Sequence, residues 1–283
     1  MSTSTNKTPD PGQSAGPGHD PTALLLRSFR LPTMAGLYEE TMQRAEKESW
    51  SHRRVLRHLC ESEAIDRGER RTARLLADSG LPESKTLSSL EESKLPASIR
   101  RQLPALIDGH FVDRATNILA FGLPGRGKTH FLAALGRELI LRHSRRVLFR
   151  PAFKIVGQLL AAKRDLRLEK ELKKLDRYEV LILDDIGYLQ QSREEMEVLF
   201  TLLAERYERR SVLLSTNLVF SQWDQIFKDP MTTMAAVDRL VHHSIILEFN
   251  GPSRRVGTPG SGSQSGDHRQ SSTDPADQTG EGT

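Results

Sequence analysis

A glycine-rich segment at residues 122–129, GLPGRGKT, constrains the fold of this chain more than any other feature. It fits the pattern G-x-x-x-x-G-K-[ST] and stands between an apolar run, ILAF, and a helical pattern, HFLAALGRELILR. A strand, a glycine loop and a helix in this order place backbone N–H groups around phosphate oxygens at the positive end of the helix. The alternative, an ordinary glycine turn before a helix, leaves the preceding strand unexplained. We therefore predict a phosphate-binding loop formed by Gly122, Leu123, Pro124, Gly125, Arg126, Gly127, Lys128, Thr129 and His130.

Two side chains of this loop carry the predicted chemistry. Lys128 is expected to reach the β- and γ-phosphates of a nucleotide, and the Thr129 hydroxyl is expected to complete the shell of a magnesium ion. The predicted cofactors are therefore ATP and Mg²⁺.

After Asn117 the sequence alternates short apolar runs with longer amphipathic stretches. Buried strands alternating with helices indicate a parallel sheet with helices on both faces. The predicted fold class is an α/β, three-layer αβα domain with a five-stranded parallel sheet. The five expected strands are Ile118–Phe121, Val147–Phe149, Val180–Leu183, Val212–Leu214 and Ile245–Leu247.

The region before the sheet has a different pattern. Apolar residues recur at three- and four-residue intervals from Leu24 to about Leu103, which predicts a small helical domain. Both ends of the chain are almost without apolar side chains and cannot build a core. The predicted division is a disordered segment 1–20, a helical domain 21–108, a nucleotide-binding domain 109–250 and a disordered Gly/Ser-rich tail 251–283.

Paired acids follow the third apolar run, in the sequence VLILDD. Such a strand delivers Asp184 to the carboxyl edge of the sheet, where ligands of open α/β folds gather. We predict that Asp184 holds magnesium and that Asp185 polarises the attacking water. Each aspartate alone fits a helix N-cap equally well, and it is their position some fifty residues after the glycine loop that favours catalysis.

A third polar element, Ser215-Thr216-Asn217, ends the fourth apolar run. Asn217 is the predicted sensor that hydrogen-bonds a γ-phosphate or orients a water. An ordinary turn asparagine is the alternative.

Positive charge is concentrated in one segment. The chain has a formal net charge of +4, and residues 154–177 alone contain eight basic and four acidic side chains. A mixed charge run on a helix is often only a solvated face with i,i+4 ion pairs. The alternative is a stripe of phosphate contacts for sequence-independent DNA binding, made of Lys154, Lys163, Arg164, Arg167, Lys170 and Lys174.

Other features limit the class of protein. A single cysteine, Cys60, excludes an internal disulfide framework and is interpreted as buried filler. The apolar runs are far shorter than the roughly 20 residues that span a bilayer, so no membrane contact is expected. The polar N-terminus lacks a secretory signal, which indicates a cytoplasmic location.

With these motifs in order, the chain resembles the IstB-like transposition helper ATPases of the AAA+ class, which are related to the DnaC-type helicase loaders. The resemblance covers about Leu24 to Asn250. The matching segments are GLPGRGKTH (Gly122–His130), LILDDIGYL (Leu181–Leu189), STNLVFSQW (Ser215–Trp223) and MTTMAAVDRLVHHS (Met231–Ser244).

The resemblance implies a function. In that family ATP binding drives assembly of an oligomer on double-stranded DNA, and the oligomer delivers target DNA to the transposase of the same insertion sequence. The resemblance makes residues 21–108 a partner- or DNA-binding domain and residues 109–250 an AAA+ ATPase domain. The basic segment then corresponds to a helical insertion that grips DNA. Arg239 falls on the family's arginine finger, which reaches the nucleotide of a neighbouring subunit and makes hydrolysis depend on assembly; an exposed helix arginine is the alternative.

The chain departs from the family pattern at several positions. Asp185 stands where glutamate is frequent, and Arg126 is larger and more charged than usual, so it could contact phosphate or a neighbouring subunit. His242 and His243 have no carboxylate or cysteine cluster beside them in the sequence and are interpreted as structural. Two other functions stay open: a DnaC-like replicative helicase loader, and a DNA-binding scaffold that binds ATP without useful turnover.

Overall fold

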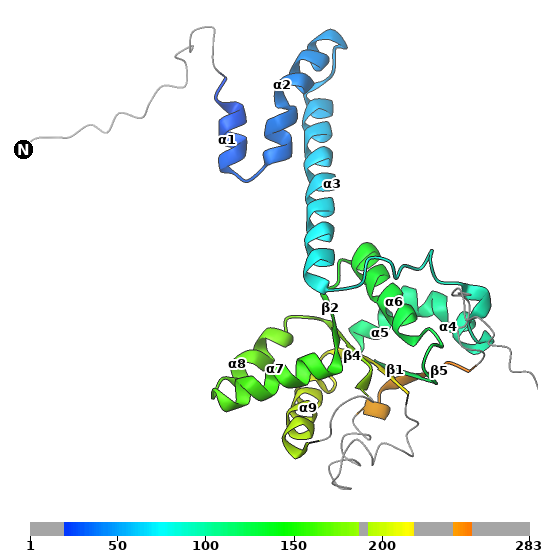
Figure 1. The fold of residues 1–283 in the computed structure, drawn as a ribbon. Coiled ribbons are helices and arrows are strands. Elements are labelled where there is room, and N and C mark those ends of the chain that lie inside the picture. The colour runs from blue at the N-terminus through cyan, green and yellow to red at the C-terminus, as the bar shows by residue number, and fades with distance from the viewer. Residues whose placement is uncertain (1–19, 187–191, 218–239, 251–283) are drawn as a thin grey trace, which may run out of the picture.

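A computed structural model describes residues 20–186, 192–217 and 240–250. Within these residues the strands form one five-stranded sheet in the order β2-β3-β4-β1-β5, and every pairing is parallel (Figure 1). The prediction of a five-stranded parallel sheet is therefore confirmed. The strands are β1 (Asn117–Phe121), β2 (Val147–Pro151), β3 (Val180–Asp184), β4 (Ser211–Thr216) and β5 (Ser244–Glu248).

Helices cover both faces of this sheet, as the predicted αβα layers require. Alternate residues of a strand point to opposite faces, so each strand contributes to two hydrophobic cores. Ile118 and Ile182 pack in one core, whereas Leu119 and Leu181 pack in the other. The first core contains side chains of α4 (Ala97–Ile107), α5 (His110–Asp113) and α6 (Lys128–His143). The second contains those of α7 (Ala152–Arg164), α8 (Leu168–Leu175) and α9 (Arg193–Arg206).

Further helices precede the sheet. They are α1 (Thr22–Ser28), α2 (Pro32–Lys47), the long α3 (His52–Ser79) and a 3₁₀ turn, η1 (Glu92–Lys94). In Figure 1, α1 and α2 pack beside the upper part of α3, away from the sheet, and the lower end of α3 meets β2 and α6. Gly80, with φ +66°, ends α3 in the left-handed conformation.

A buried carboxylate ties α2 to α3. The Glu63 side chain, which is 5% exposed, accepts hydrogen bonds from the backbone N–H groups of Thr33 (2.9 Å) and Met34 (3.1 Å) at the start of α2. Arg70 and Arg67 lie 3.1 Å and 3.5 Å from its Oε1 atom. Burial alone would raise the pKa of Glu63, but these backbone hydrogen bonds and the two guanidinium groups lower it below its ordinary value.

The segment after α3 packs with the sheet. Leu81, Leu90 and Leu95 are buried in the same hydrophobic core as β1 and α6, and so are Ile99 and Phe111. The predicted division at residue 108 stays a prediction; what the packing adds is that residues 81–113 help to enclose the first face of the sheet. The predicted disordered ends, 1–20 and 251–283, lie outside the described residues except for Asp20.

The interpretation of Cys60 as a buried residue is wrong. Cys60 is exposed on α3, a helix of 28 residues in which only Leu59, Glu63 and Ser79 are buried. α2 contacts α3 around Glu63, and β2 and α6 also contact α3, but most of the helix surface, Cys60 included, faces solvent.

Candidate functional site

Parallel pairing brings the three predicted polar elements to one edge of the sheet. Phe121 of β1 pairs with Thr216 of β4, and Leu183 of β3 pairs with Leu214 of β4. The glycine loop after β1, the acids that end β3 and the polar end of β4 therefore lie side by side at the carboxyl edge.

The glycines of the loop have conformations that other residues rarely adopt. Gly122 has a φ of +146°, and a Cβ atom at this position would lie 2.6 Å from the Phe249 carbonyl oxygen. Gly125 and Gly127 have φ angles of +78° and +92°. Positive φ values turn successive N–H groups into one concavity, which is the geometry that binds phosphate.

Lys128 lies inside this loop. Its ammonium group donates hydrogen bonds to the carbonyl oxygens of Gly122 (2.5 Å) and Leu123 (3.1 Å), and the residue is buried. These carbonyls hold the Lys128 ammonium group beside the concavity. Phosphate oxygens can accept hydrogen bonds from the same three N–H donors.

A hydrogen-bond network joins the start of α6 to the carboxyl ends of β3 and β4. The hydroxyl groups of Thr129 (2.8 Å) and Ser215 (2.6 Å) both donate to Asp184 Oδ1. The backbone N–H of Asp185 in turn donates to Ser215 Oγ at 2.8 Å. Asp185 adopts a left-handed φ of +61°, a conformation that carries strain for a non-glycine residue and often marks functional sites. Asp184, Asp185 and Thr129, all predicted from the sequence, are therefore brought together.

Ser215 has a place in this network that sequence reasoning did not give it. Asn217 is the sensor predicted from the segment Ser215-Thr216-Asn217, yet Ser215 is the residue that contacts both Asp184 and Asp185. Asn217 is half-buried, and its Oδ1 atom has no hydrogen-bond partner among the described residues. An amide oxygen without a protein partner can accept a hydrogen bond from a water.

The remaining loop residues differ in their surroundings. Leu123 and Pro124 are exposed, and the Arg126 Nε atom is buried without a hydrogen-bond partner in the described part of the chain. The His130 Nε2 atom lies 3.1 Å from the Thr86 carbonyl oxygen and 3.0 Å from Ser89 Oγ. His130 therefore joins the start of α6 to the segment before α4. Arg239 lies outside the described residues.

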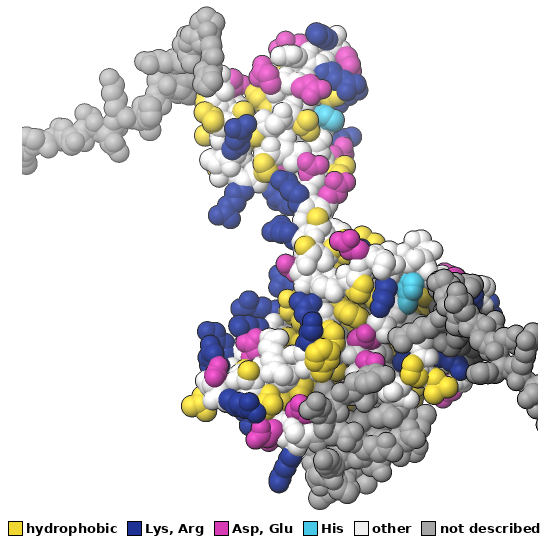
Figure 2. Space-filling model, viewed as in Figure 1, with side chains coloured by type: hydrophobic (Ala, Val, Ile, Leu, Met, Phe, Trp, Pro, Cys, Tyr) yellow, Lys and Arg dark blue, Asp and Glu magenta, His cyan; other side chains and the backbone are white. Residues whose placement is uncertain are grey.

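Most of the predicted DNA-binding stripe is ion-paired. Lys163 and Arg164 of α7 lie 2.8 Å and 3.6 Å from Glu197 and Glu194 of α9. The other pairs in the stripe join Arg167 to Asp165 and Lys174 to Glu171. Lys154 and Lys170 are exposed. Figure 2 shows Lys and Arg side chains over α7 and α8 and beside the lower end of α3, with acidic side chains among them.

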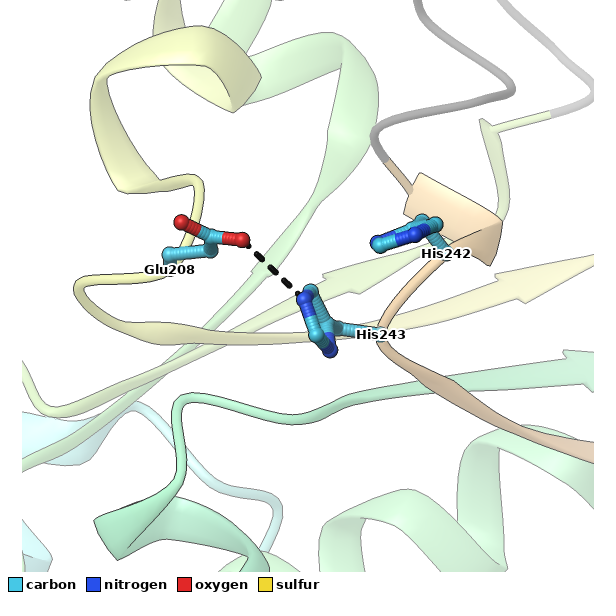
Figure 3. A group of neighbouring side chains, drawn as sticks. All are labelled: Glu208, His242 and His243. Atoms are coloured by element: carbon cyan, nitrogen blue, oxygen red, sulfur yellow. Dashed lines mark hydrogen bonds and ion pairs between the residues drawn. The ribbon is translucent and has the colours of Figure 1, made fainter.

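The fold gives the histidine pair a carboxylate neighbour. His243 Nε2 lies 3.0 Å from Glu208 Oε1, and the rings of His242 and His243 pack edge to face, with centroids 4.6 Å apart (Figure 3). One ligand atom from each of the three residues lies within 4.8 Å of the others. All three side chains are exposed, and His243 precedes β5, so the group is at the amino end of the sheet, opposite the glycine loop.

A buried arginine, also missed from the sequence, fixes the amino end of β3. The Arg206 guanidinium donates to the carbonyl oxygens of Leu175 (3.1 Å), Tyr178 (2.9 Å) and Ser211 (3.2 Å), and a longer bond of 3.4 Å reaches Glu179. Burial lowers the pKa of Arg206 to about 10, so the group is still charged at neutral pH. No local pattern distinguishes this arginine from the neighbouring Arg209 and Arg210.

Comparisons with known proteins agree with this geometry. The model of the family described as "IstB-like ATP binding protein" matches residues 24–260. A protein of Sinorhizobium fredii that is named as an insertion sequence ATP-binding protein is 41% identical over 233 residues, which cover 82% of this chain and 78% of the relative. A protein of Pseudomonas aeruginosa named as an ATP-binding protein of insertion sequence IS21 is 35% identical, over 82% of this chain and 88% of the relative.

A solved structure supports the fold. The replication initiator DnaA bound to AMPPCP and single-stranded DNA matches with a TM-score of 0.50 at 19% identity, over 60% of this chain and 51% of that chain. At this identity the likeness concerns the fold alone. Across the described residues, every helix is too short or too polar to cross a bilayer.

Proposed function

The chain belongs to the family of IstB-like ATP-binding proteins, and from this membership we propose that it is an ATP-hydrolysing transposition helper. In this proposal it assembles on double-stranded DNA and delivers target DNA to the transposase of its own insertion sequence. The observation that carries the proposal is the Asp184 carboxylate, which accepts hydrogen bonds from Thr129 after the glycine loop and from Ser215 at the end of β4.

The residues of this edge fit ATP with Mg²⁺. Thr129 Oγ1 and Asp184 Oδ1 lie 2.8 Å apart. Hydroxyl and carboxylate oxygens are the donors that Mg²⁺ prefers, so Thr129 would hold the ion directly and Asp184 would hold it through a water. Bound there, the ion would neutralise charge on the phosphates, while the N–H groups of residues 122–129 and Lys128 bind their oxygens.

Hydrolysis requires a positioned water. Asp185 is the proposed residue that polarises it, and Asn217, whose Oδ1 atom has no partner among the described residues, is the proposed residue that orients it. We propose that Arg239 is the arginine finger that completes the nucleotide site of a neighbouring subunit. A finger supplied by a neighbour couples turnover to assembly, because an isolated subunit lacks one group that stabilises the transition state.

The proposed DNA contacts include the basic stripe predicted on α7 and α8. Four of the six predicted residues, Lys163, Arg164, Arg167 and Lys174, already have acidic partners within 4 Å. A paired cation releases fewer counterions when it meets a phosphate, so we expect the stripe of α7 and α8 to make only a secondary contribution.

The test is ATP hydrolysis measured against protein concentration, with and without double-stranded DNA, together with the mass of the assembled species in ATP and in ADP. We expect turnover to rise with both DNA and assembly. Asp185→Asn should retain ATP binding and lose turnover, with the exposed Asp108→Asn at the end of α4 as a control of equal charge change. ATP binding without turnover under every condition would contradict the helper and favour a scaffold; absence of ATP binding would contradict both.

A further inference from the structure

A second concave surface lies apart from the carboxyl edge, between the lower end of α3 and the outer edge of the sheet at β2. Its volume is about 680 Å³. Six basic side chains line it, and we call it the α3–β2 groove. They are Arg71 and Arg74 of α3, Arg146 and Arg150 at β2, Lys174 of α8, and Arg177 between α8 and β3.

Acidic side chains offset little of this charge. Asp78 and Glu171 are the carboxylates that line the groove, and Glu171 is already bonded to Lys174 and to Gln158. The side chains of Arg71, Arg146 and Arg177 are exposed and have no hydrogen bond or ion pair to any described residue. The groove therefore holds uncompensated positive charge, in contrast to the ion-paired face of α7 and α9.

Unpaired guanidinium groups on several walls of one cleft favour an extended polyanion. We propose that the α3–β2 groove binds the phosphodiester backbone of double-stranded DNA; this inference rests on the proposed function and names the site of its DNA contact. A guanidinium group presents a planar fork of donors that matches phosphate oxygens, and low-dielectric walls strengthen the attraction.

The walls of the groove are positioned by other contacts. Arg146 directly precedes β2, and its backbone carbonyl accepts the N–H of Val180 at 3.2 Å. Arg177 lies between carbonyls that the buried Arg206 holds, those of Leu175 and Tyr178. Because sheet and arginine contacts fix these positions, a ligand would have to order little more than the arginine side chains on binding.

The lining favours backbone contact over stacking on single strands. Single-stranded nucleic acid sites place successive bases on several aromatic rings. Among the described residues that line the groove, Tyr178 is the only aromatic residue, and it is only partly exposed. Arginine contacts to phosphates carry no sequence information, so we expect binding to be indifferent to base sequence.

The part of the groove that holds Arg146 and Arg177 is separate from the nucleotide site. Arg146 and Arg177 lie at the amino ends of β2 and β3, whereas Asp184 lies at the carboxyl end of β3. Changes in the groove should therefore leave ATP binding intact.

The experiment compares two triple variants of the full chain. One carries Arg71→Glu, Arg146→Glu and Arg177→Glu in the groove; the control carries Arg100→Glu, Arg101→Glu and Arg114→Glu, which are exposed and do not line it. Both make the same change in net charge. Binding to a labelled mixed-sequence 30-base-pair duplex, and to one of its strands alone, is measured by fluorescence anisotropy in ATP and Mg²⁺ at several salt concentrations. ATP binding and thermal unfolding are measured alongside.

We expect the groove variant to lose at least about 100-fold in duplex affinity at 0.1 M salt. Its plot of log K against log salt should be shallower by about 3, since each lost phosphate contact removes about 0.9 from the slope. The control should lose less than about fivefold. A variant with glutamine at the three groove positions should show an intermediate loss, which protects the test if charge reversal impairs folding.

Other outcomes contradict the inference in separate ways. If the wild-type protein binds duplex and the groove variant binds as well as the control, the DNA site is elsewhere while the proposed function stands. If the groove variant loses affinity only for single-stranded DNA, the inference of a duplex site is wrong. If the wild-type protein binds neither duplex nor ATP, the proposed function itself fails.

Discussion

The carboxyl edge of the sheet and the α3–β2 groove are built in opposite ways. The edge is made from short contiguous motifs, and its functional side chains, such as Thr129, Asp184 and Ser215, are bonded to one another. The groove is made from single arginines spread between residues 71 and 177, and three of them have no bonded side-chain partner within the described residues. A site that binds a compact ligand requires local order, whereas a site for a long polyanion requires only that charges converge.

The largest effect that separates the two regions should come from the edge. Lys128→Ala removes the ammonium group that the proposed function assigns to phosphate binding, and we expect ATP turnover to fall by more than about 1,000-fold, or about 4 kcal/mol. Lys47→Ala on α2 is the matched control. Turnover by phosphate release and ATP affinity are the measurements, and duplex binding without nucleotide should change little. Parallel loss of DNA binding would mean that the two regions are one site.

The next largest effect should come from Arg206, the buried residue that fixes the backbone on either side of Arg177 in the groove. Arg206→Met leaves buried carbonyl groups without a donor, each of which costs about 1–3 kcal/mol, and we expect a loss of roughly 3 kcal/mol in the free energy of unfolding. Chemical denaturation measures it, with the exposed Arg193→Met as control. A loss no greater than that of the control would show that the carbonyl bonds contribute little.

A smaller effect tests whether the edge depends on its network. Ser215→Ala removes the hydroxyl that joins Asp184 to Asp185, so we expect turnover to fall by about 10-fold while ATP affinity changes by less than about threefold. Ser211→Ala is a close control, because Ser211 is equally buried in β4 and its Oγ atom has no hydrogen-bond partner among the described residues. Equal turnover in the two variants would remove Ser215 from the mechanism.

The helical region should respond to pH through Glu63. Its lowered pKa means that the folded state prefers the carboxylate, so this stabilisation is present above the unfolded pKa near 4.5 and is lost as the pH falls through the lowered value. Glu63→Gln should lower the unfolding midpoint by roughly 2–4 °C at pH 7, and the difference from wild type should shrink as the pH falls below 4.5. Glu61→Gln, on the exposed side of α3, is the control; a difference that persists unchanged at pH 3 would contradict the interpretation.

The smallest effect should come from the paired face. Lys163→Gln with Arg164→Gln removes two charges that Glu197 and Glu194 already offset, and exposed pairs of this kind contribute about 1 kcal/mol or less. We expect duplex affinity to fall by less than about threefold. The same two substitutions to glutamine at Arg146 and Arg177 are the comparison, and a larger loss from α7 would reverse the assignment of the DNA surface.

The sequence predicted the edge because the information there is local. Each strand is a short aliphatic run, and the residues that follow β1 and β3 come directly after such runs. The role of Ser215, the clamp of Arg206 and the approach of Glu208 to His243 depend on partners about 30 or more residues away, which periodicity cannot reveal. Counting charges along the sequence likewise could not show that Lys163 and Arg164 have acidic partners on α9, which are close only in the folded chain.

The length of α3 gives the groove a mechanical property. A helix of 28 residues extends about 42 Å, and one wall of the groove lies at its lower end while α1 and α2 are attached to its upper part (Figure 1). A stiff rod amplifies motion at its pivot, so a tilt of about 10° at the groove would sweep the far end through roughly 7 Å. Phosphates bound between Arg71 and Arg146 would thus displace α1 and α2. Cys60 is exposed on α3 and is the single thiol of the chain, so a spectroscopic probe attached there could record this displacement.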